Sequence, residues 1–238
     1  MKTAIVIGGT GLVGAQLVDL LLNDQDFEKI KVFGRRSLNI SNSKLEEHLI
    51  NFSKPESWSD LVKGDVLFSC IGTTVSKAES KEKQFEVDFT YQYNFAEIAS
   101  MNRVGEYVLI SSIGANSKSI FFYLRMKGEL EDAIKKLSFK KIIIVRPAQL
   151  YGNRHEKRVG ETMGLAISKA LCKIGLFHEH RPIHARRVAE AMIESTRYYN
   201  STVTISSSEL FGCLNFTTEI KIFIIQKKVP VNCFLINI

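Results

Sequence analysis

The stretch AIVIGGTGLVGAQLVDLLL, residues 4–22, decides the fold of this 238-residue chain. It joins an apolar run that fits a buried strand to a segment with the apolar spacing of a helix, and it contains Gly8, Gly11 and Gly14. One glycine permits a sharp turn, one lets the backbone approach a phosphate, and one lets helix and strand pack closely. Free N–H groups at the start of such a helix attract anions. The G-x-x-G-x-x-G spacing in this context predicts a loop that binds dinucleotide phosphates, with a purely structural turn as the alternative.

Along the rest of the chain, short apolar runs alternate with longer segments of helical period. The runs are continuous, which is typical of strands covered on both faces. We therefore predict an α/β fold: a Rossmann-type doubly wound parallel sheet with right-handed crossovers and a small C-terminal substrate-side region. The expected strands are 3–7, 29–33, 48–52, 65–71, 106–111 and 140–146, and the expected helices are 11–23, 55–62, 82–103 and 122–137.

The regular alternation of apolar runs and helical segments ends after Arg146. Beyond it we expect helices at 160–174 and 185–198 and a strand at 202–206. This part follows the carboxyl ends of the strands, so residues 148–185 are predicted to form the substrate-side segment. We assign 1–212 to a single NAD(P)-binding Rossmann domain. The apolar, β-prone tail at 213–238 is open to three interpretations: an edge strand, a cover for an apolar patch, or a loose segment prone to association.

Composition narrows the class of protein. The 32 Lys and Arg against 25 Asp and Glu give a net charge of +7, but the basic residues are dispersed, so a solvated surface is favoured over nucleic-acid binding. The longest apolar runs are far shorter than the ~18 residues of a membrane span, so we expect a soluble protein with no membrane partner. The four cysteines have no CxxC pair, which argues against a disulfide framework or zinc site and favours a cytoplasmic location. Although His178, His180 and His184 lie close together, neighbouring Arg181 opposes a cation, and we expect no metal.

The second predicted strand runs into KVFGRRS, where an acidic residue would be expected to bind the ribose 2′-hydroxyl of NAD. Arg35 and Arg36 stand there instead, and their planar forks suit a 2′-phosphate. We therefore predict NADP(H) as the cofactor, with NAD(H) as the second choice; two ordinary surface arginines are the alternative. The expected cofactor-binding residues are Gly8, Thr10, Gly11, Leu12, Val13, Gly14, Arg35, Arg36, Cys70, Gly72, Thr73, Thr74, Lys127 and Pro147.

Residues 108–131, VLISSIGANSKSIFFYLRMKGELE, lead from a strand through a loop into a helix that carries Tyr123 and Lys127. Side chains four positions apart share a helix face, with β-carbons ~5–6 Å apart. Lowering a tyrosine pKa from ~10 to ~7 needs ~4 kcal/mol, and one ammonium ~5 Å away supplies ~3.3 kcal/mol at an effective dielectric of ~20. We expect Tyr123 to exchange a proton, Lys127 to assist, and Ser111 or Ser112 to orient a carbonyl or hydroxyl. The alternative is an ordinary amphipathic pair.

These motifs, together with RPAQLYG at 146–152, resemble the short-chain dehydrogenase/reductase superfamily, and CIGTTVSKA at 70–78 most resembles its atypical Tat-interacting-protein-like subgroup. The resemblance covers about 3–210. It implies an NADPH-binding Rossmann domain in which Tyr123 is the acid or base, Lys127 holds the ribose and lowers the tyrosine pKa, Ser112 is the orienting serine and Pro147 borders the nicotinamide. The helix position at which many members carry asparagine holds Asp88 instead.

From the sequence we predict an NADP(H)-dependent oxidoreductase that reduces a carbonyl or oxidises an alcohol of a small substrate, with Ser112, Tyr123 and Lys127 as its catalytic residues. The alternative is a non-catalytic NADPH-binding regulator, because the fold alone does not establish turnover. The chain is expected to be a monomer or a homodimer, and the resemblance suggests helices 82–103 and 122–137 as the dimer contact.

Overall fold

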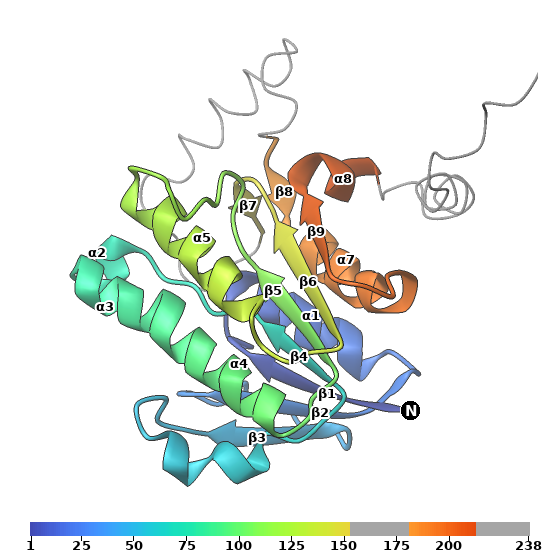
Figure 1. The fold of residues 1–238 in the computed structure, drawn as a ribbon. Coiled ribbons are helices and arrows are strands. Elements are labelled where there is room, and N and C mark those ends of the chain that lie inside the picture. Colours follow the sequence, from blue (N-terminus) through green and yellow to red (C-terminus); the bar gives the residue numbers. More distant parts are fainter. Residues whose placement is uncertain (153–180, 213–238) are drawn as a thin grey trace, which may run out of the picture.

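The computed structural model describes residues 1–152 and 181–212 of the chain. Seven parallel strands form one sheet, with helices on both of its faces (Figure 1). In chain order the strands of this sheet are β1 (Lys2–Ile7), β2 (Phe27–Gly34), β3 (Leu45–Leu49), β4 (Val66–Ser69), β5 (Glu106–Ile110), β6 (Lys141–Arg146) and β9 (Val203–Ser206). The helices are α1 (Leu12–Leu22), α2 (Val75–Ala78), α3 (Lys81–Phe85), α4 (Tyr91–Met101), α5 (Phe122–Ile134), α7 (Ala185–Tyr198) and α8 (Ser207–Gly212).

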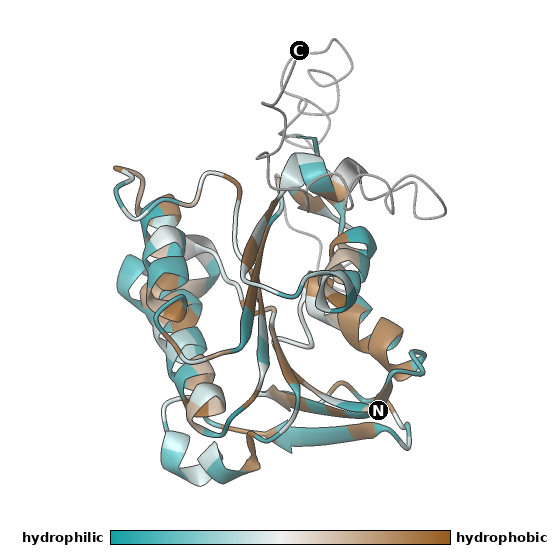
Figure 2. Ribbon diagram, turned by 45° about the vertical axis from the view of Figure 1, so that its right-hand side comes forward, coloured by the Kyte–Doolittle hydropathy of each residue, from teal (hydrophilic) through white to brown (hydrophobic). Residues whose placement is uncertain are grey.

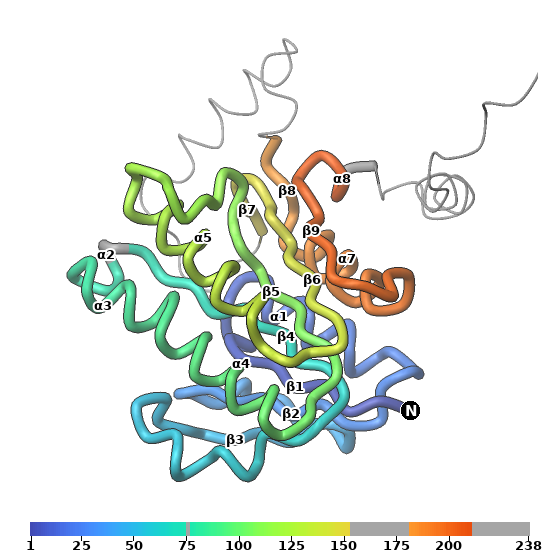
Figure 3. Tube along the Cα trace, viewed as in Figure 1, coloured from blue at the N-terminus to red at the C-terminus, as the bar shows by residue number. Residues whose placement is uncertain are grey.

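The strand order is β3-β2-β1-β4-β5-β6-β9. From β1 the chain builds outward to β3, then crosses back to place β4 on the other side of β1 and continues to β9, as the trace in Figure 3 shows. In doubly wound sheets a ligand binds at the carboxyl ends of the two strands where the direction of winding reverses, which here are β1 and β4. The order and the parallel pairing confirm the predicted Rossmann-type fold.

Two apolar cores lie on opposite faces of the sheet, because successive strand residues point to opposite sides. Val6 belongs to the core formed with α1 and α7, and its neighbour Ile7 to the core formed with α4 and α5. Figure 2 shows the brown strands between these two helical layers. The packing explains the continuous apolar runs of the sequence, since both faces of each central strand are covered.

The predicted helix at 55–62 is wrong. The segment forms two 3₁₀ turns, η1 (Pro55–Ser57) and η2 (Ser59–Leu61), separated by Trp58. The Trp58 side chain is fully buried and its indole N–H donates to the Asn51 carbonyl at 2.9 Å. Anchoring the ring in the core interrupts the regular turn, so the local hydrogen bonds close over three residues rather than four.

The strand predicted at 48–52 is displaced. β3 ends at Leu49, which pairs with Gly34, the last residue of β2. Asn51 then forms a turn, in which its side-chain oxygen accepts from the Ser53 N–H at 3.0 Å. Phe52 leaves the sheet and stacks on Tyr91. The other predicted strands and α1, α5 and α7 agree with the structure to within a few residues.

The helix predicted at 82–103 is interrupted by η3 (Glu86–Thr90), a turn of π-helix between α3 and α4. The segment 148–185 begins and ends in a two-stranded parallel sheet, in which β7 (Leu150–Tyr151) pairs with β8 (Ile183–His184). The helix predicted at 160–174 and the tail at 213–238 lie outside the described residues. Among the described helices, none combines the length and apolar character needed to cross a membrane.

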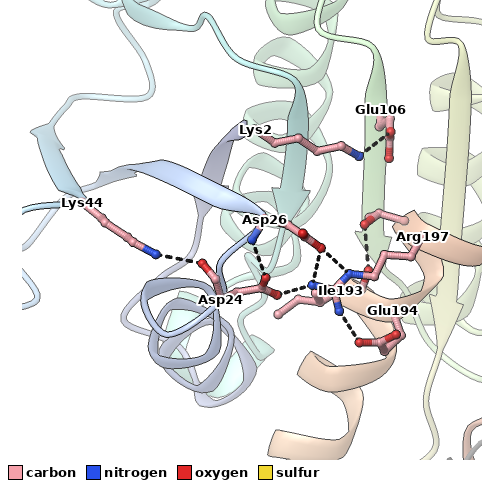
Figure 4. Close-up of polar contacts among 9 residues, drawn as sticks. Lys2, Asp24, Asp26, Lys44, Glu106, Ile193, Glu194 and Arg197 are labelled. Carbon is pink, nitrogen blue, oxygen red and sulfur yellow. Dashed lines mark hydrogen bonds and ion pairs between the residues drawn. The ribbon is translucent and has the colours of Figure 1, made fainter.

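Charged residues at the amino ends of the strands fix α7 against the turn between α1 and β2 (Figure 4). Arg197 contacts Asp24 at 2.5 Å and Asp26 at 2.9 Å, and it also pairs with Glu194 on its own helix. Lys44 donates to the Asp24 carbonyl at 2.8 Å. This network lies at the end of the sheet opposite the glycine loop, so it supports the scaffold rather than the candidate site.

Candidate functional site

The glycine loop joins the end of β1 to the start of α1. Gly8 has φ +82°, a left-handed conformation that favours glycine, and its carbonyl accepts from the Gly11 N–H at 2.9 Å. Gly11 is the N-cap of α1, and no side chain caps the helix there. The first turn therefore presents uncapped N–H groups and the positive end of the helix dipole, the features that bind phosphate.

The loop is packed too tightly for larger residues. A β-carbon at Gly14 would lie 2.1 Å from the Gly8 carbonyl oxygen, so only glycine allows α1 to start this close to β1. Thr10 is exposed and Leu12 half-buried, whereas the Val13 side chain is buried in the core. If Val13 contacts the cofactor, it does so through its backbone.

The predicted 2′-phosphate residues lie where β2 ends. Arg35 and Arg36 follow Gly34 with exposed side chains, and within residues 1–152 and 181–212 neither guanidinium has a hydrogen-bond or carboxylate partner. The next residues are anchored by Glu47 of β3, which accepts from the Ser37 hydroxyl at 2.8 Å and the Leu38 N–H at 2.6 Å. The backbone that follows β2 thus carries two cations that are unpaired within the described part of the chain.

The loop after β4 runs beside the glycine loop. Cys70 donates its N–H to the Ile7 carbonyl at 2.9 Å, and a β-carbon at Gly8 would lie 2.5 Å from the Cys70 carbonyl carbon. Burial raises the pKa of the Cys70 thiol, which therefore stays protonated at neutral pH and acts as a small packing residue. Its backbone lies directly against the glycine loop.

Farther along this loop, Gly72 is exposed and Thr73 and Thr74 are half-buried. The Thr73 N–H donates to the Asp88 carboxylate at 2.8 Å, and the Thr73 carbonyl accepts from the Gln84 side chain at 3.3 Å. The loop that would border the ribose is thus held in place by side chains from the α3–η3 segment.

The two candidate serines have different environments. The Ser111 hydroxyl is buried and donates at 2.5 Å to Glu131, which also forms an ion pair with Arg146. Ser112 is half-buried, and among the described residues its hydroxyl donates to the neighbouring Ile113 carbonyl alone, at 3.2 Å. The Ser111 hydroxyl is thus engaged by a carboxylate, and the Ser112 hydroxyl is the less constrained of the two.

Tyr123 and Lys127 share one face of α5. The Lys127 ammonium lies 6.0 Å from the centroid of the Tyr123 ring, and the tyrosine is 39% exposed whereas the lysine is buried. A β-carbon at Gly128 would lie 2.2 Å from the Ser117 backbone nitrogen, so a glycine there lets the loop from β5 lie directly on α5. No sequence pattern singles out Gly128.

Asp88 of η3 contacts Lys127 of α5, a pairing that no sequence pattern predicted. Its carboxylate lies 3.0 Å from the Lys127 ammonium, and both side chains are almost fully buried. Burial alone would lower the pKa of Lys127, but the charge of Asp88, reinforced by Tyr123 and Glu131, raises it overall. The Lys127 ammonium is therefore a charge-compensated cation rather than an isolated one.

The remaining predicted residues lie around the same end of the sheet. The Pro147 carbonyl accepts from the Ile113 N–H at 3.0 Å, which joins the strand ends of β5 and β6. His184 caps α7, with its Nδ1 accepting from the Arg186 N–H at 3.2 Å. His178 and His180 lie outside the described residues, and residues 1–152 and 181–212 contain no group of three or more potential metal-binding side chains.

Two shallow cavities of about 310 and 380 Å³ open at the amino ends of the strands. Lys2 lines both of them and pairs with Glu106, while Arg197 in the first is held by Asp24 and Asp26. Their position opposite the glycine loop and their paired charges make them part of the scaffold.

An uncapped helix behind a glycine turn, at the point where the sheet reverses its winding, defines a dinucleotide-binding Rossmann domain. The chain belongs to the NAD(P)H-binding family, whose model matches residues 8–196. It is 34% identical over 198 residues to the mitochondrial protein FMP52 of Candida albicans, covering 81% of this chain and 86% of the relative. It is 35% identical over 227 residues to the mitochondrial protein FMP52 of Lodderomyces elongisporus, covering 88% and 95%.

Solved structures share the fold at low sequence identity. The Bordetella bronchiseptica enzyme WbmH in complex with NAD⁺ has a TM-score of 0.65 and 14% identity, over 87% of this chain and 76% of that one. UDP-glucose 4-epimerase of Thermotoga maritima has a TM-score of 0.64 and 17% identity, over 90% and 82%. These likenesses support the Rossmann-like architecture described above.

The expected cytoplasmic location is wrong, because the relatives are named as mitochondrial proteins. The expectation rested on the sparse cysteines, which indicate a reducing compartment. A low cysteine content does not distinguish a protein of the cytosol from one inside an organelle.

Proposed function

We propose that the chain is an NADP(H)-dependent oxidoreductase that interconverts a carbonyl and an alcohol on a small substrate. One set of contacts carries the proposal: Asp88 binds the backbone of the loop beside the phosphate site and, through Lys127, the helix that presents Tyr123. The predicted cofactor crevice and the predicted proton donor are thereby parts of one rigid assembly.

The residues present fit a dinucleotide. The N-cap Gly11 has no side chain to cap α1, so the free N–H groups of the first turn suit a pyrophosphate. The peptide groups of Thr10, Gly11, Leu12 and Val13 would face it, and the backbone of Gly72 to Thr74 would border the ribose. When bound, a nicotinamide dinucleotide supplies or accepts the hydride.

Arg35 and Arg36 support NADP(H) over NAD(H). Both guanidinium groups are exposed and unpaired at the carboxyl end of β2, where the adenosine ribose lies in this fold. A 2′-phosphate would form charge-assisted hydrogen bonds with them, whereas a 2′-hydroxyl would leave two cations crowded together.

In this proposal Tyr123 transfers the proton to or from the substrate oxygen, and Ser112 orients that oxygen with its hydroxyl. Lys127 holds the ribose and favours the ionised phenol. Pro147 borders the reacting centre from the end of β6. The resemblance to the Tat-interacting-protein-like subgroup agrees with these roles, and the exposure of Tyr123 leaves its ring open to a substrate.

The test is the variant Tyr123→Phe, which removes the hydroxyl and keeps the ring. We expect NADPH affinity within about twofold of wild type and a loss of turnover of at least ~100-fold on any carbonyl substrate found in a panel, as for the removal of a general acid. Tyr93→Phe is the matched control, because Tyr93 bonds Glu97 on α4 away from the crevice and its loss should leave turnover unchanged. Full turnover in Tyr123→Phe would refute the proton role.

A second candidate function is a non-catalytic NADPH-binding regulator. The glycine loop and the uncapped start of α1 would bind the cofactor without any turnover, and the fold alone does not establish catalysis. Wild-type protein that binds NADPH but turns over no carbonyl or alcohol in a broad panel would favour the regulator.

We further propose that the chain acts in mitochondria, on the strength of the names of its relatives. Its partner is a small-molecule substrate rather than nucleic acid or membrane, and it is a monomer or a homodimer. The dispersed basic residues support the exclusion of nucleic acid, and a steep salt dependence of DNA or RNA binding would contradict it.

A further inference from the structure

His184 lies beside the start of α1, although the two are far apart in the sequence. It pairs with Tyr151 in the two-stranded sheet of β7 and β8, and its ring packs edge-to-face on the Tyr151 ring with the centroids 5.3 Å apart. A β-carbon at Gly152 would lie 3.7 Å from His184 Nε2 and 3.2 Å from Leu12 Cδ1. The imidazole and the first residue of α1 therefore border the same small space, which the glycine leaves open.

The backbone on both sides of His184 is fixed. The Ile183 N–H donates to the Gln149 carbonyl at 2.9 Å, which holds β8 against the segment that follows β6. Ala185 has no exposed surface and belongs to the core that α7 shares with α1. The imidazole thus extends from a rigid position between β8 and α7.

The two ring nitrogens of His184 have different environments. Nδ1 accepts from the Arg186 N–H at 3.2 Å and so caps the start of α7. A ring nitrogen that accepts a hydrogen bond carries no proton, so the hydrogen of the neutral imidazole is on Nε2. Within residues 1–152 and 181–212, Nε2 has no hydrogen-bond partner, and the side chain is half-buried. An oriented N–H donor without a partner therefore borders the start of α1.

Histidine is not a residue that capping alone would favour. Asparagine, aspartate and serine are the preferred N-caps, because a short side chain reaches the first free N–H groups of a helix. The imidazole of His184 supplies that acceptor and adds a donor on the opposite side of the ring. The second nitrogen is the part of the side chain that the fold itself does not use.

We propose that His184 is a cofactor-binding residue, whose Nε2–H donates to a phosphate oxygen on the nicotinamide side of the pyrophosphate. The inference rests on the proposed function and adds a side-chain donor to a phosphate site otherwise formed by backbone N–H groups. The nicotinamide side is favoured because β7 begins three residues after Pro147, which borders the nicotinamide in that proposal. An anionic oxygen forms a charge-assisted hydrogen bond with such a donor.

The experiment uses two substitutions that separate the two nitrogens. His184→Asn keeps an acceptor near the position of Nδ1 and removes the Nε2–H. His184→Gln carries an amide N–H near the position of Nε2 and removes the cap. NADPH binding is measured by calorimetry on the full chain, and thermal unfolding is measured on the same samples.

We expect His184→Asn to bind NADPH at least ~10-fold more weakly than wild type, because a hydrogen bond to an anion is lost. Its Tm should stay within ~1 °C of wild type, since asparagine caps a helix well. His184→Gln should bind NADPH within ~3-fold of wild type and unfold ~2–4 °C lower, since only the cap is lost. If His184 were a helix cap and nothing more, His184→Asn would bind NADPH as wild type does, which would overturn the proposal.

Adenosine 2′,5′-bisphosphate is the matched control ligand, because it lacks the phosphate on the nicotinamide side. His184→Asn should bind it within about twofold of wild type, since the contact with His184 is not made. Equal losses for this ligand and for NADPH would show a general disturbance of the crevice and would overturn the proposal.

The binding measurement needs no turnover, so its result is separate from the proposed activity. A wild-type protein that binds NADPH without turnover, together with the expected loss in His184→Asn, would support this inference while the proposed function fails. Full turnover with unchanged NADPH affinity in His184→Asn would overturn this inference alone. A wild-type protein that binds no dinucleotide would overturn both.

Discussion

The substitution Gly14→Ala tests whether the tight packing of α1 against β1 builds the phosphate site. The new β-carbon would lie 2.1 Å from the Gly8 carbonyl oxygen and 2.8 Å from its carbonyl carbon, distances at which atoms do not coexist. The obstacle is backbone rather than a flexible side chain, so the start of the helix must move away from the strand by about 1 Å.

Overpacking of this kind costs ~3 kcal/mol, and the better helix propensity of alanine returns ~1 kcal/mol. The net loss of ~2 kcal/mol corresponds to a fall in Tm of ~4–8 °C for a chain of this size. The same displacement moves the N–H groups of the first turn away from a bound phosphate. Losing two such hydrogen bonds to an anion costs ~3 kcal/mol, which is ~100-fold in affinity.

The assay is NADPH binding by calorimetry, with thermal unfolding measured on the same samples. Gly105→Ala is the control, because its β-carbon would lie 3.6 Å from the Asp65 carbonyl oxygen, an ordinary contact far from the crevice. The control should bind NADPH as wild type does. Wild-type NADPH affinity in a Gly14→Ala protein would refute the assignment of the phosphate site to this loop.

Three further predictions follow from the same geometry. Arg35→Ala with Arg36→Ala should weaken NADPH binding at least ~30-fold and NADH binding less than ~3-fold, as two charge-assisted hydrogen bonds are lost; equal losses would defeat the 2′-phosphate assignment. Because burial raises its thiol pKa, Cys70 should resist iodoacetamide at pH 8 in the folded chain, as peptide mapping will show; rapid alkylation would contradict its packed environment. Neighbouring charges hold the folded-state pKa of Lys127 above 10.5. The contribution of Lys127 to the free energy of unfolding should therefore be constant from pH 7 to 9 and decline only as the pH rises through the folded-state pKa. Urea unfolding of wild type and Lys127→Met checks this, and a decline below pH 9 would be inconsistent with it.

The central sheet was predictable because its strands are buried on both faces. Continuous apolar runs such as VLFSCI leave little freedom in where a strand lies. β3 is different: its sequence LEEHL is half-polar, because an edge strand has fewer neighbours and fewer apolar contacts. The residues after β3 are more apolar than β3 itself, so the strand was predicted too far along the chain, as far as Phe52. The Phe52 ring instead packs against aromatic rings outside the sheet.

The candidate site was predictable only where the residues are close together in sequence. The glycine loop and the pair of Tyr123 and Lys127 have fixed local spacings that imply their geometry. The contact between Asp88 and Lys127 joins two different helices, so no local pattern reveals it. The engagement of Ser111 by Glu131 is likewise a tertiary contact, and it is what distinguishes the two adjacent serines.

The most direct measurement is a crystal structure of the full chain with NADPH. We expect the pyrophosphate oxygens to lie within hydrogen-bond distance of the first-turn N–H groups of α1. We also expect the reactive nicotinamide carbon to lie within ~4 Å of a substrate carbon whose oxygen contacts the Tyr123 hydroxyl. A dinucleotide bound in the cavities at the amino ends of the strands, or a nicotinamide ring turned away from Tyr123, would contradict it.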